Sequence, residues 1–400
     1  MQIETSKMKV AIIAYSCEPN KGSEPGVAWD FIEEMNRRGH ELFIFTKADK
    51  KHIIANSNLN DLVSFQFVNS PNVWLKRKLV PLRILHYYLW NVACLLYFKR
   101  GFRASEFDIV HHVTFVNDWM PSAGAFFGPR FIIGPIGRHP NLPVRYLACL
   151  KVSDALREVF RRVSRGIFGA MSLFTQLMLR RAETIFVINE DSIKNRFKFK
   201  TKVLPAIAIN LQKFGLSKYV EKKEKPFRLY WAGNFIYWKA PEIAIRSFLK
   251  ARKTVLNLEL HMFGANGDFS KISTKYANID GLFFHGKKQQ EDFFERIIKM
   301  DAFLYPSFEG GGMVVLEAMA SGKPVIGIRF GGLSQMVTNQ SGILVDFVDF
   351  KTTIADLEHG IIKLSQDRNL LAKLSRGALK RVHQFSIIHK CDVIENIWHG

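Results

Sequence analysis

Three consecutive glycines, Gly310 to Gly312, lie between a short apolar segment and a run of helix-forming residues. Glycines at a helix start let backbone N–H groups approach an anion closely, because no Cβ stands in the way. Two carboxylates bracket the turn: Glu309 precedes it, and Glu317 lies about a turn into the helix. Each can accept hydrogen bonds from sugar hydroxyls. A site for both phosphate and polyol predicts a nucleotide-sugar ligand.

The run from Tyr305 to Val325 resembles the E-x7-E signature of retaining glycosyltransferase family 4. The resemblance implies that Glu309 contacts the donor sugar and that Glu317 holds the nucleotide ribose. It assigns the diphosphate to the backbone of the intervening residues, Gly310, Gly311, Gly312, Met313 and Val314. The alternative is an ordinary glycine-rich turn with acidic residues at the surface.

A second turn, from Ala232 to Ala240, is predicted to contact the leaving group. Lys239 lies where this loop meets a helix, and a lysine there can reach a diphosphate. The family usually has an arginine shortly after the glycine of this turn, where this chain has Asn234. Either another cation such as Arg329 or Lys287 replaces it, or the activity is weak or altered. A solvated lysine at a helix start is the alternative interpretation of Lys239.

Two further glycines, Gly264 and Gly286, end apolar segments that are predicted to be strands. The resemblance assigns the stretch His285, Gly286 and Lys287 to base recognition through backbone groups, so the side chains do not identify the base. Plain turns at strand ends would look the same.

The first half of the chain contains two loops of small residues, predicted to lie near the donor phosphates or the acceptor. One resembles the Gly-Ser-Glu-Pro-Gly segment of a family 4 subgroup, and the other resembles a Gly-Pro-x-Gly-Gly segment in which an arginine replaces a glycine. Their candidate residues are Gly22, Ser23, Gly26, Gly137 and Arg138. Acceptor recognition is expected to differ at the arginine.

Two adjacent histidines, His111 and His112, end another predicted strand, where many family members carry a histidine near the sugar. His112 is favoured for the catalytic role, and His111 can equally be a core histidine. The sequence shows no catalytic triad or metal-ligand cluster, and the cleft motifs lack Asp-x-Asp. This pattern fits the metal independence that the resemblance implies.

Strands and helices that alternate along the chain must position these residues, and such alternation predicts parallel sheets. The predicted fold class is α/β, of the GT-B type: two doubly wound Rossmann-like domains face a cleft, and a C-terminal helix crosses back to the first domain. The predicted boundaries are 1–212 for the acceptor-side domain, 213–384 for the nucleotide-sugar domain and 385–400 for the returning helix. A charge-rich break at 216–226 marks the linker.

The composition is that of a globular protein, but its charge is unusual. Lys and Arg number 57 and Asp and Glu 36, so the formal net charge is +21. This surplus indicates an anionic partner: nucleic acid, an acidic membrane surface or a phosphorylated small molecule. No nucleic-acid-binding module is recognised, which argues against the first.

Two apolar segments, 84–98 and 167–179, are framed by basic residues, a pattern typical of helices that lie on an anionic bilayer. The alternative is that both helices simply pack on a sheet. The basic residues are Lys76, Arg77, Lys78, Arg83, Lys99, Arg100 and Arg103 around the first segment, and Arg145, Lys151, Arg157, Arg161, Arg162, Arg165, Arg180 and Arg181 around the second.

The expected location is the cytoplasm, at the inner face of the cell membrane. The four cysteines are widely spaced, which predicts a reducing compartment without disulfides or a zinc site. The polar start of the chain does not resemble a signal peptide, and no segment has the roughly 18 to 20 apolar residues of a membrane span.

The sequence therefore predicts a retaining, metal-independent glycosyltransferase that uses a UDP- or GDP-linked sugar and no cofactor. Its acceptor is predicted to be a lipid-linked or cell-envelope glycan, as in lipopolysaccharide or exopolysaccharide biosynthesis. A nucleotide-sugar epimerase of the same fold and a catalytically degenerate, basic binding subunit remain as alternatives.

Overall fold

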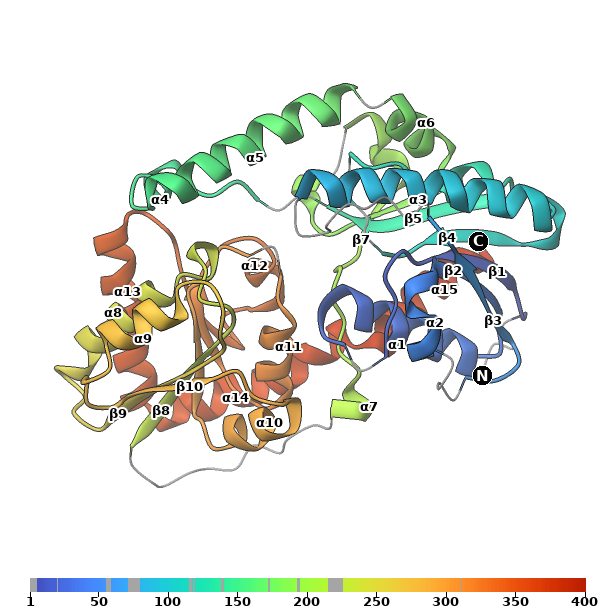
Figure 1. Ribbon diagram of the computed structural model, residues 1–400. Helices are drawn as coiled ribbons and strands as arrows, with labels where there is room; N and C mark the ends of the chain where they lie inside the picture. Colours follow the sequence, from blue (N-terminus) through green and yellow to red (C-terminus); the bar gives the residue numbers. More distant parts are fainter. Residues whose placement is uncertain are drawn as a thin grey trace. The chain divides into compact units, whose positions relative to one another are not determined.

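The chain forms two compact units in a computed structural model (Figure 1). The structure describes residues 6–19, 21–54, 59–70, 80–114, 117, 119–137, 140–171, 173–192, 195–214, 226–309 and 311–400. Unit 1 comprises Met1–Arg138, Ser164–Ala208 and Ile387–Gly400, and unit 2 comprises His139–Val163 and Ile209–Ser386. Residues 139–163, expected in the first domain, thus belong to unit 2.

Unit 1 is built on a seven-stranded parallel sheet in the order β3-β2-β1-β4-β5-β6-β7. This order, which runs outward in both directions from β1 and β4, is that of a doubly wound sheet. The central strands β1, β4, β5 and β6 are largely apolar and buried, as strands covered on both faces must be, whereas the edge strands β3 and β7 are partly exposed. They are β1 Lys9–Ile13, β2 Glu41–Lys47, β3 Val63–Val68, β4 Ile109–His112, β5 Arg130–Ile136, β6 Thr184–Val187 and β7 Thr201–Val203.

The helices of unit 1 include α1 Ser23–Arg37, α2 Lys51–Ile54, α3 Val80–Gly101, α6 Leu173–Arg181 and α15 Ile387–His399, and α5 Val152–Met171 begins in unit 2 and ends in unit 1. The apolar segment 84–98 lies in α3. Its residues Tyr87, Trp90, Cys94 and Phe98 recur every three or four positions and join the core of the sheet. This face of α3 therefore packs on the sheet, and Lys76, Arg77 and Lys78 lie outside the described residues.

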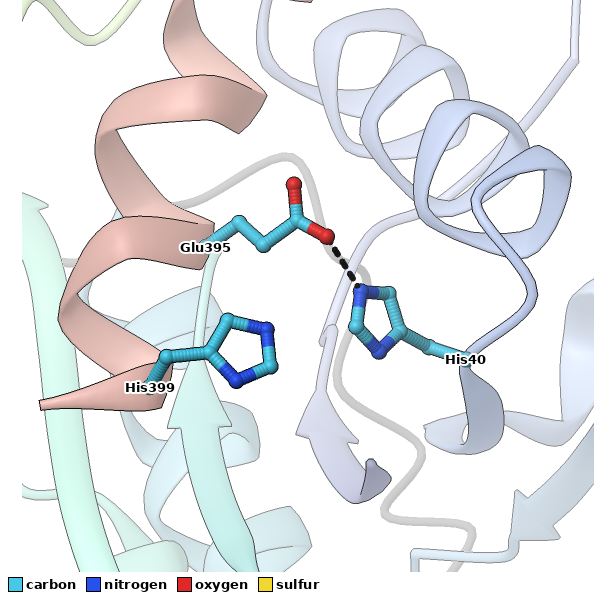
Figure 2. A group of neighbouring side chains, drawn as sticks. All are labelled: His40, Glu395 and His399. Carbon is cyan, nitrogen blue, oxygen red and sulfur yellow. Dashed lines mark hydrogen bonds and ion pairs between the residues drawn. The ribbon is translucent and has the colours of Figure 1, made fainter. Parts of the chain in front are cut away.

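The returning helix α15 is anchored in unit 1 by ion pairs and a histidine (Figure 2). Arg38 donates to Glu395 at 2.5 Å, and His40 Nε2 lies 2.9 Å from the other oxygen of that carboxylate. His40 Nδ1 accepts a hydrogen bond from the Met8 N–H at 3.3 Å, so Nε2 carries the proton. His40, Glu395 and His399 have the spacing of metal ligands. The protonated Nε2 and the arginine-paired carboxylate indicate instead that these residues hold α15 in place.

Unit 2 is built on a six-stranded parallel sheet in the order β10-β9-β8-β11-β12-β13. Its strands are β8 Phe227–Ala232, β9 Leu258–Phe263, β10 Leu282–Gly286, β11 Ala302–Tyr305, β12 Val325–Ile328 and β13 Gly342–Val345. Its helices are α4 Val144–Leu147, α7 Leu211–Phe214, α8 Pro241–Arg252, α9 Phe269–Lys275, α10 Gln290–Ile298, α11 Met313–Ala320, α12 Leu333–Met336, α13 Phe350–Gln366 and α14 Arg368–Val382. In the described part of the chain, no helix is both long enough and apolar enough to span a bilayer.

Candidate functional site

The candidate site lies at the carboxyl ends of β8 and β11, the two central strands of unit 2. These strands pair directly, with Leu229 opposite Ala302 and Tyr230 opposite Phe303. The chain continues from β8 toward one edge of the sheet and from β11 toward the other, so their ends form a topological switch point. Ligands of open α/β sheets bind at such a point.

Hydrogen bonds join the loops that follow these two strands. The Phe308 N–H donates to the Trp238 carbonyl at 2.7 Å, and the Ser307 hydroxyl donates to the same carbonyl at 3.3 Å. The β8 loop ends in the short 3₁₀ turn Tyr237–Lys239, followed by Ala240 in the left-handed conformation. Pro241 then starts α8 with a backbone angle already suited to a helix. Lys239 is thus fixed at the end of a rigid turn.

Lys239, Tyr305 and Glu309 form a compact trio at the centre of the site. Lys239 Nζ lies 2.8 Å from Glu309 Oε2 and 3.0 Å from the Tyr305 hydroxyl, which donates to the same Glu309 oxygen at 2.8 Å. Burial lowers the pKa of Lys239, but Tyr305 and Glu309 outweigh it and hold that pKa above its usual range. Burial raises the pKa of Tyr305 to about 12, against the opposing effect of Lys239. The trio therefore keeps a protonated ammonium next to a carboxylate.

The first turn of α11 contains no acidic residue. Gly312 is its N-cap residue, and no side chain of the described residues caps it. Helix N–H groups left without a side-chain partner, together with the helix dipole, favour an anion at this end. Gly311, Gly312, Met313 and Val314 lie here as predicted from the sequence, whereas Gly310 is outside the described residues.

Glu317, one turn into α11, has an altered acidity. Burial raises its pKa to about 7, and the neighbouring Lys239 partly opposes the shift. Among the described residues, none donates a hydrogen bond to its carboxylate. A carboxylate in this state gains from a ligand that brings hydroxyl donors.

Asn234 stands where arginine was expected from the resemblance, and its side chain is hydrogen-bonded to a second amide. Asn234 Oδ1 accepts a hydrogen bond from Asn266 Nδ2 at 3.3 Å. Of the two cations considered as replacements, Arg329 is held by Asp346 at 3.1 Å and by the Leu344 carbonyl. Lys287 is exposed at the end of β10. Of the three cations considered, Lys239 is the one that contacts Tyr305 and Glu309.

The turn that ends β9 is tightly fitted to the β8 loop, and the Gly286 carbonyl at the end of β10 accepts a hydrogen bond from the Gly264 N–H at 2.8 Å. Gly264 has a φ of +132°, and a Cβ there would lie 1.8 Å from the Gly233 carbonyl oxygen, so only glycine fits. His285 Nε2 lies 2.9 Å from His261 Nδ1, and His261 Nε2 lies 3.2 Å from Glu259. Burial and then His261 lower the pKa of His285 to about 4. The base-recognition role of His285, Gly286 and Lys287 stays a prediction.

The small-residue loops predicted in the first domain lie in unit 1. Gly22 caps α1, and a Cβ on Gly26 would lie 1.7 Å from the Lys21 carbonyl oxygen. Ser23 is the first residue of α1. Gly137 pairs with Asn117 in an isolated parallel bridge, and Arg138 lies outside the described residues. Their roles near phosphates or acceptor stay predictions.

The structure separates the two histidines by their surroundings. The His111 ring packs against Phe31, Phe186 and Trp398, as in a core position. His112 Nε2 donates to the Thr114 carbonyl at 2.8 Å, so its proton lies on that nitrogen. Burial lowers the pKa of His112 to about 4, which keeps the ring neutral. The catalytic role predicted for His112 remains untested.

Sequence reasoning missed a residue that supports both site loops. The Tyr146 hydroxyl donates to the Tyr237 carbonyl at 2.5 Å, and its ring lies 4.2 Å from that of Phe308. These two contacts adjoin Lys239 and Glu309 along the chain. Tyr146 belongs to the segment 139–163, and no local pattern assigns that segment to unit 2.

Residues 215–381 match the family model for Glycosyl transferases group 1. The chain is 27% identical over 160 residues to an uncharacterized glycosyltransferase of Methanocaldococcus jannaschii, covering 38% of this chain and 40% of that relative. It is 28% identical over 129 residues to a D-inositol 3-phosphate glycosyltransferase of an Arthrobacter species, covering 30% and 31%. The matched stretches thus span less than half the length of these relatives.

Two solved structures are similar over nearly the whole chain. HepE of Anabaena in complex with UDP has a TM-score of 0.62 at 16% identity and covers 98% of this chain and 99% of its own. WaaG, a glycosyltransferase involved in lipopolysaccharide biosynthesis, has a TM-score of 0.60 at 16% identity and covers 98% and 100%. At such identities the likeness shows the fold. The chain therefore has the GT-B fold, as predicted from the sequence, and its residues 215–381 match the Glycosyl transferases group 1 model.

Proposed function

We propose that the chain transfers a sugar from a nucleoside diphosphate sugar to a hydroxyl group of an acceptor, with retention of the anomeric configuration. The trio of Lys239, Tyr305 and Glu309 beside the uncapped start of α11 supports this proposal most directly. A diphosphate takes the place of Glu309 at the Lys239 ammonium, and Glu309 then accepts from the sugar hydroxyls. Glu317 holds the ribose.

In the reaction, the bond between the sugar C1 and the diphosphate oxygen breaks while the acceptor oxygen attacks C1 from the same face. The acceptor proton passes to the leaving phosphate oxygen. Lys239 and the N–H groups of α11 stabilise the charge that grows on that oxygen, and such preorganised charge is usually the largest catalytic contribution. The mechanism needs no metal and no cofactor, and His112 acts near the sugar.

The donor is UDP- or GDP-linked. The UDP bound in the HepE structure supports the first, although the likeness to that protein is one of fold. A thermal-shift panel of UDP, GDP and ADP tests the site, because a ligand that binds the native state alone raises the melting temperature. Absence of a shift with every nucleotide contradicts the proposal.

The acceptor is a lipid-linked or cell-envelope glycan, reached from the inner face of the membrane. The net charge of +21 supports an anionic surface as partner, and a role in polysaccharide biosynthesis agrees with the involvement of WaaG in lipopolysaccharide biosynthesis. Incubating the protein with a labelled donor and an extract of envelope lipids, followed by chromatography, tests whether label enters the lipid fraction.

Two other functions are separable by product. An epimerase of this fold converts the nucleotide sugar without an acceptor. Asn234, at the usual place of an arginine, favours a degenerate binding subunit as the second candidate. Release of nucleoside diphosphate that depends on donor and acceptor excludes both.

A further inference from the structure

A row of four polar side chains crosses strands β8, β9 and β10 of unit 2 and ends at His285. Arg228 Nε donates to Glu259 Oε2 at 3.0 Å, and His261 Nε2 lies 3.2 Å from the same oxygen. His261 Nδ1 lies 2.9 Å from His285 Nε2. We call this row, Arg228, Glu259, His261 and His285, the histidine relay.

The relay determines which ring nitrogens carry protons. A carboxylate only accepts hydrogen bonds, so the proton of His261 lies on Nε2, next to Glu259. Nδ1 of that neutral ring is an acceptor, and the proton of His285 therefore lies on Nε2. Burial lowers the pKa of His261, and burial and then His261 lower the pKa of His285 to about 4, so both rings are neutral at pH 7. His285 Nδ1 is left with a lone pair.

His285 Nδ1 is the open end of the relay. In the described part of the chain no group donates a hydrogen bond to this nitrogen, and the nitrogen is not buried. The ring itself is fixed on both sides. It stacks on Phe263 with centroids 4.6 Å apart and on His261 with centroids 5.2 Å apart. The relay thus holds an unsatisfied hydrogen-bond acceptor in one orientation.

His285 lies at the carboxyl end of β10, in line with the loops of the candidate site. The Gly286 carbonyl is bonded to Gly264, which packs against the Gly233 carbonyl. A Cβ on Gly233 would lie 2.7 Å from Lys239 Cδ, so these strand ends touch one another as far as Lys239. Neighbouring strands are about 4.8 Å apart, which places β10 about 10 Å from β8. A ribose and a base span that distance from a diphosphate at Lys239.

We propose that His285 Nδ1 accepts a hydrogen bond from a ring N–H of the donor's base. The inference rests on the proposed function, and it assigns to a side chain what the resemblance assigns to backbone groups. Uracil N3 and guanine N1 carry a proton, whereas cytosine and adenine have an unprotonated ring nitrogen at the equivalent position. A fixed acceptor that meets a second acceptor loses the bond, so His285 selects uracil or guanine.

Calorimetric titration of the full-length protein with UDP, GDP, 3-methyl-UDP and 1-methyl-GDP tests this role and identifies the base. For the nucleotide that binds, methylation of the ring nitrogen should weaken affinity about 10-fold or more, because the fixed acceptor loses its donor. His285→Phe keeps a ring that can stack on Phe263 but offers no acceptor. This variant should bind the nucleotide and its methylated analogue with equal affinity.

A second variant tests the relay without changing His285. His261→Phe removes the acceptor of the Nε2 proton, so that this proton can move to His285 Nδ1. The ratio of the two affinities should therefore fall below that of the parent protein. The matched control is His359→Phe, at an exposed histidine of α13, which should keep the parent's ratio. Melting without nucleotide shows that each variant is folded.

Equal affinity of the parent protein for the nucleotide and its methylated analogue would overturn the inference and leave the proposed function intact. Full discrimination by His285→Phe would also overturn it, since the methyl group would then be rejected by shape alone. A parent protein that binds none of the four nucleotides would contradict the proposed function and this inference together.

Discussion

At the scale of single residues, the trio of Lys239, Tyr305 and Glu309 explains how the site holds a poorly solvated charge. The Lys239 side chain is charged and only 12% exposed, and a charge so removed from water is costly without a partner. Glu309 and the Tyr305 hydroxyl compensate that charge at the position where the diphosphate is proposed to bind. Tyr305 was not predicted from the sequence, because its position in the run reads as the last apolar residue of a buried strand. Only the fold shows that its hydroxyl reaches the neighbouring loop.

Loss of the Lys239 charge and loss of the Tyr305 hydroxyl should therefore lower kcat to different extents. Lys239→Ala is expected to lower kcat by about 100-fold or more, the order for losing one preorganised charge stabiliser. Tyr305→Phe keeps the charge and loses only an orienting hydrogen bond, so about 10-fold is expected. Steady-state kinetics of both variants, with Lys253→Ala as an exposed control of unit 2, checks this. Full activity of Lys239→Ala would place the diphosphate elsewhere.

The raised pKa of Glu317 makes the stability of the folded protein depend on pH. Its folded pKa of about 7 exceeds the ordinary value of 4.5, so the folded state binds the proton more tightly than the unfolded state. This contribution to the free energy of unfolding is fully present below pH 4.5 and is lost as the pH rises toward 7. Glu317→Gln should make melting temperature less dependent on pH across this window.

The same residue should bind nucleotide better when it is ionised, because ribose hydroxyls donate to a carboxylate. Nucleotide affinity of the parent protein is therefore expected to increase as the pH rises through about 7, and the affinity of Glu317→Gln to be weaker and flatter. Calorimetric titration with the nucleotide from the thermal-shift panel measures both. An identical pH profile in the two proteins would remove Glu317 from the ribose site.

At the scale of elements, local patterns explain most of what was predicted correctly. Alternating strands and helices predicted parallel sheets, and both sheets are parallel, because buried parallel strands carry their apolar pattern in their own residues. The assignment of residues 139–163 failed because it depends on contacts distant in sequence, such as that of Tyr146 with Phe308. The uncapped start of α11 was predictable from its glycines.

Tyr146 should act as a positioning residue for both site loops. Tyr146→Phe keeps the ring contact with Phe308 and loses the hydrogen bond to the Tyr237 carbonyl, so a modest decrease in kcat, about 3- to 10-fold, is expected. Tyr146→Ala loses both and should also raise the KM for the donor. Equal effects of the two variants would show that the hydrogen bond alone matters.

Helix α15 should be essential to unit 1. Trp398 is fully buried and packs against Phe31, His40 and His111. Trp398→Ala is expected to destabilise the protein by about 3 to 5 kcal/mol, the range for large aromatic residues in a core. Denaturant unfolding measures this, and Val348→Ala, at an exposed site of unit 2, is the control. A loss below 1 kcal/mol would mean that α15 contributes little to the core of unit 1.

At the scale of the whole molecule, positive charge is proposed to do what a divalent cation does in many phosphate-transfer sites. The chain carries a net charge of +21, and Lys239 and the α11 N-terminus lie at the position proposed for the diphosphate, with Glu309 paired to Lys239. Chelation by EDTA should therefore leave kcat unchanged.

Because salt screens the long-range attraction of an anionic donor, raising ionic strength from about 0.05 to 0.5 M should raise the KM for the donor while kcat changes little. Kinetics with and without EDTA across this range test both statements, and loss of activity with EDTA that Mg²⁺ restores would show that the reaction needs a metal after all.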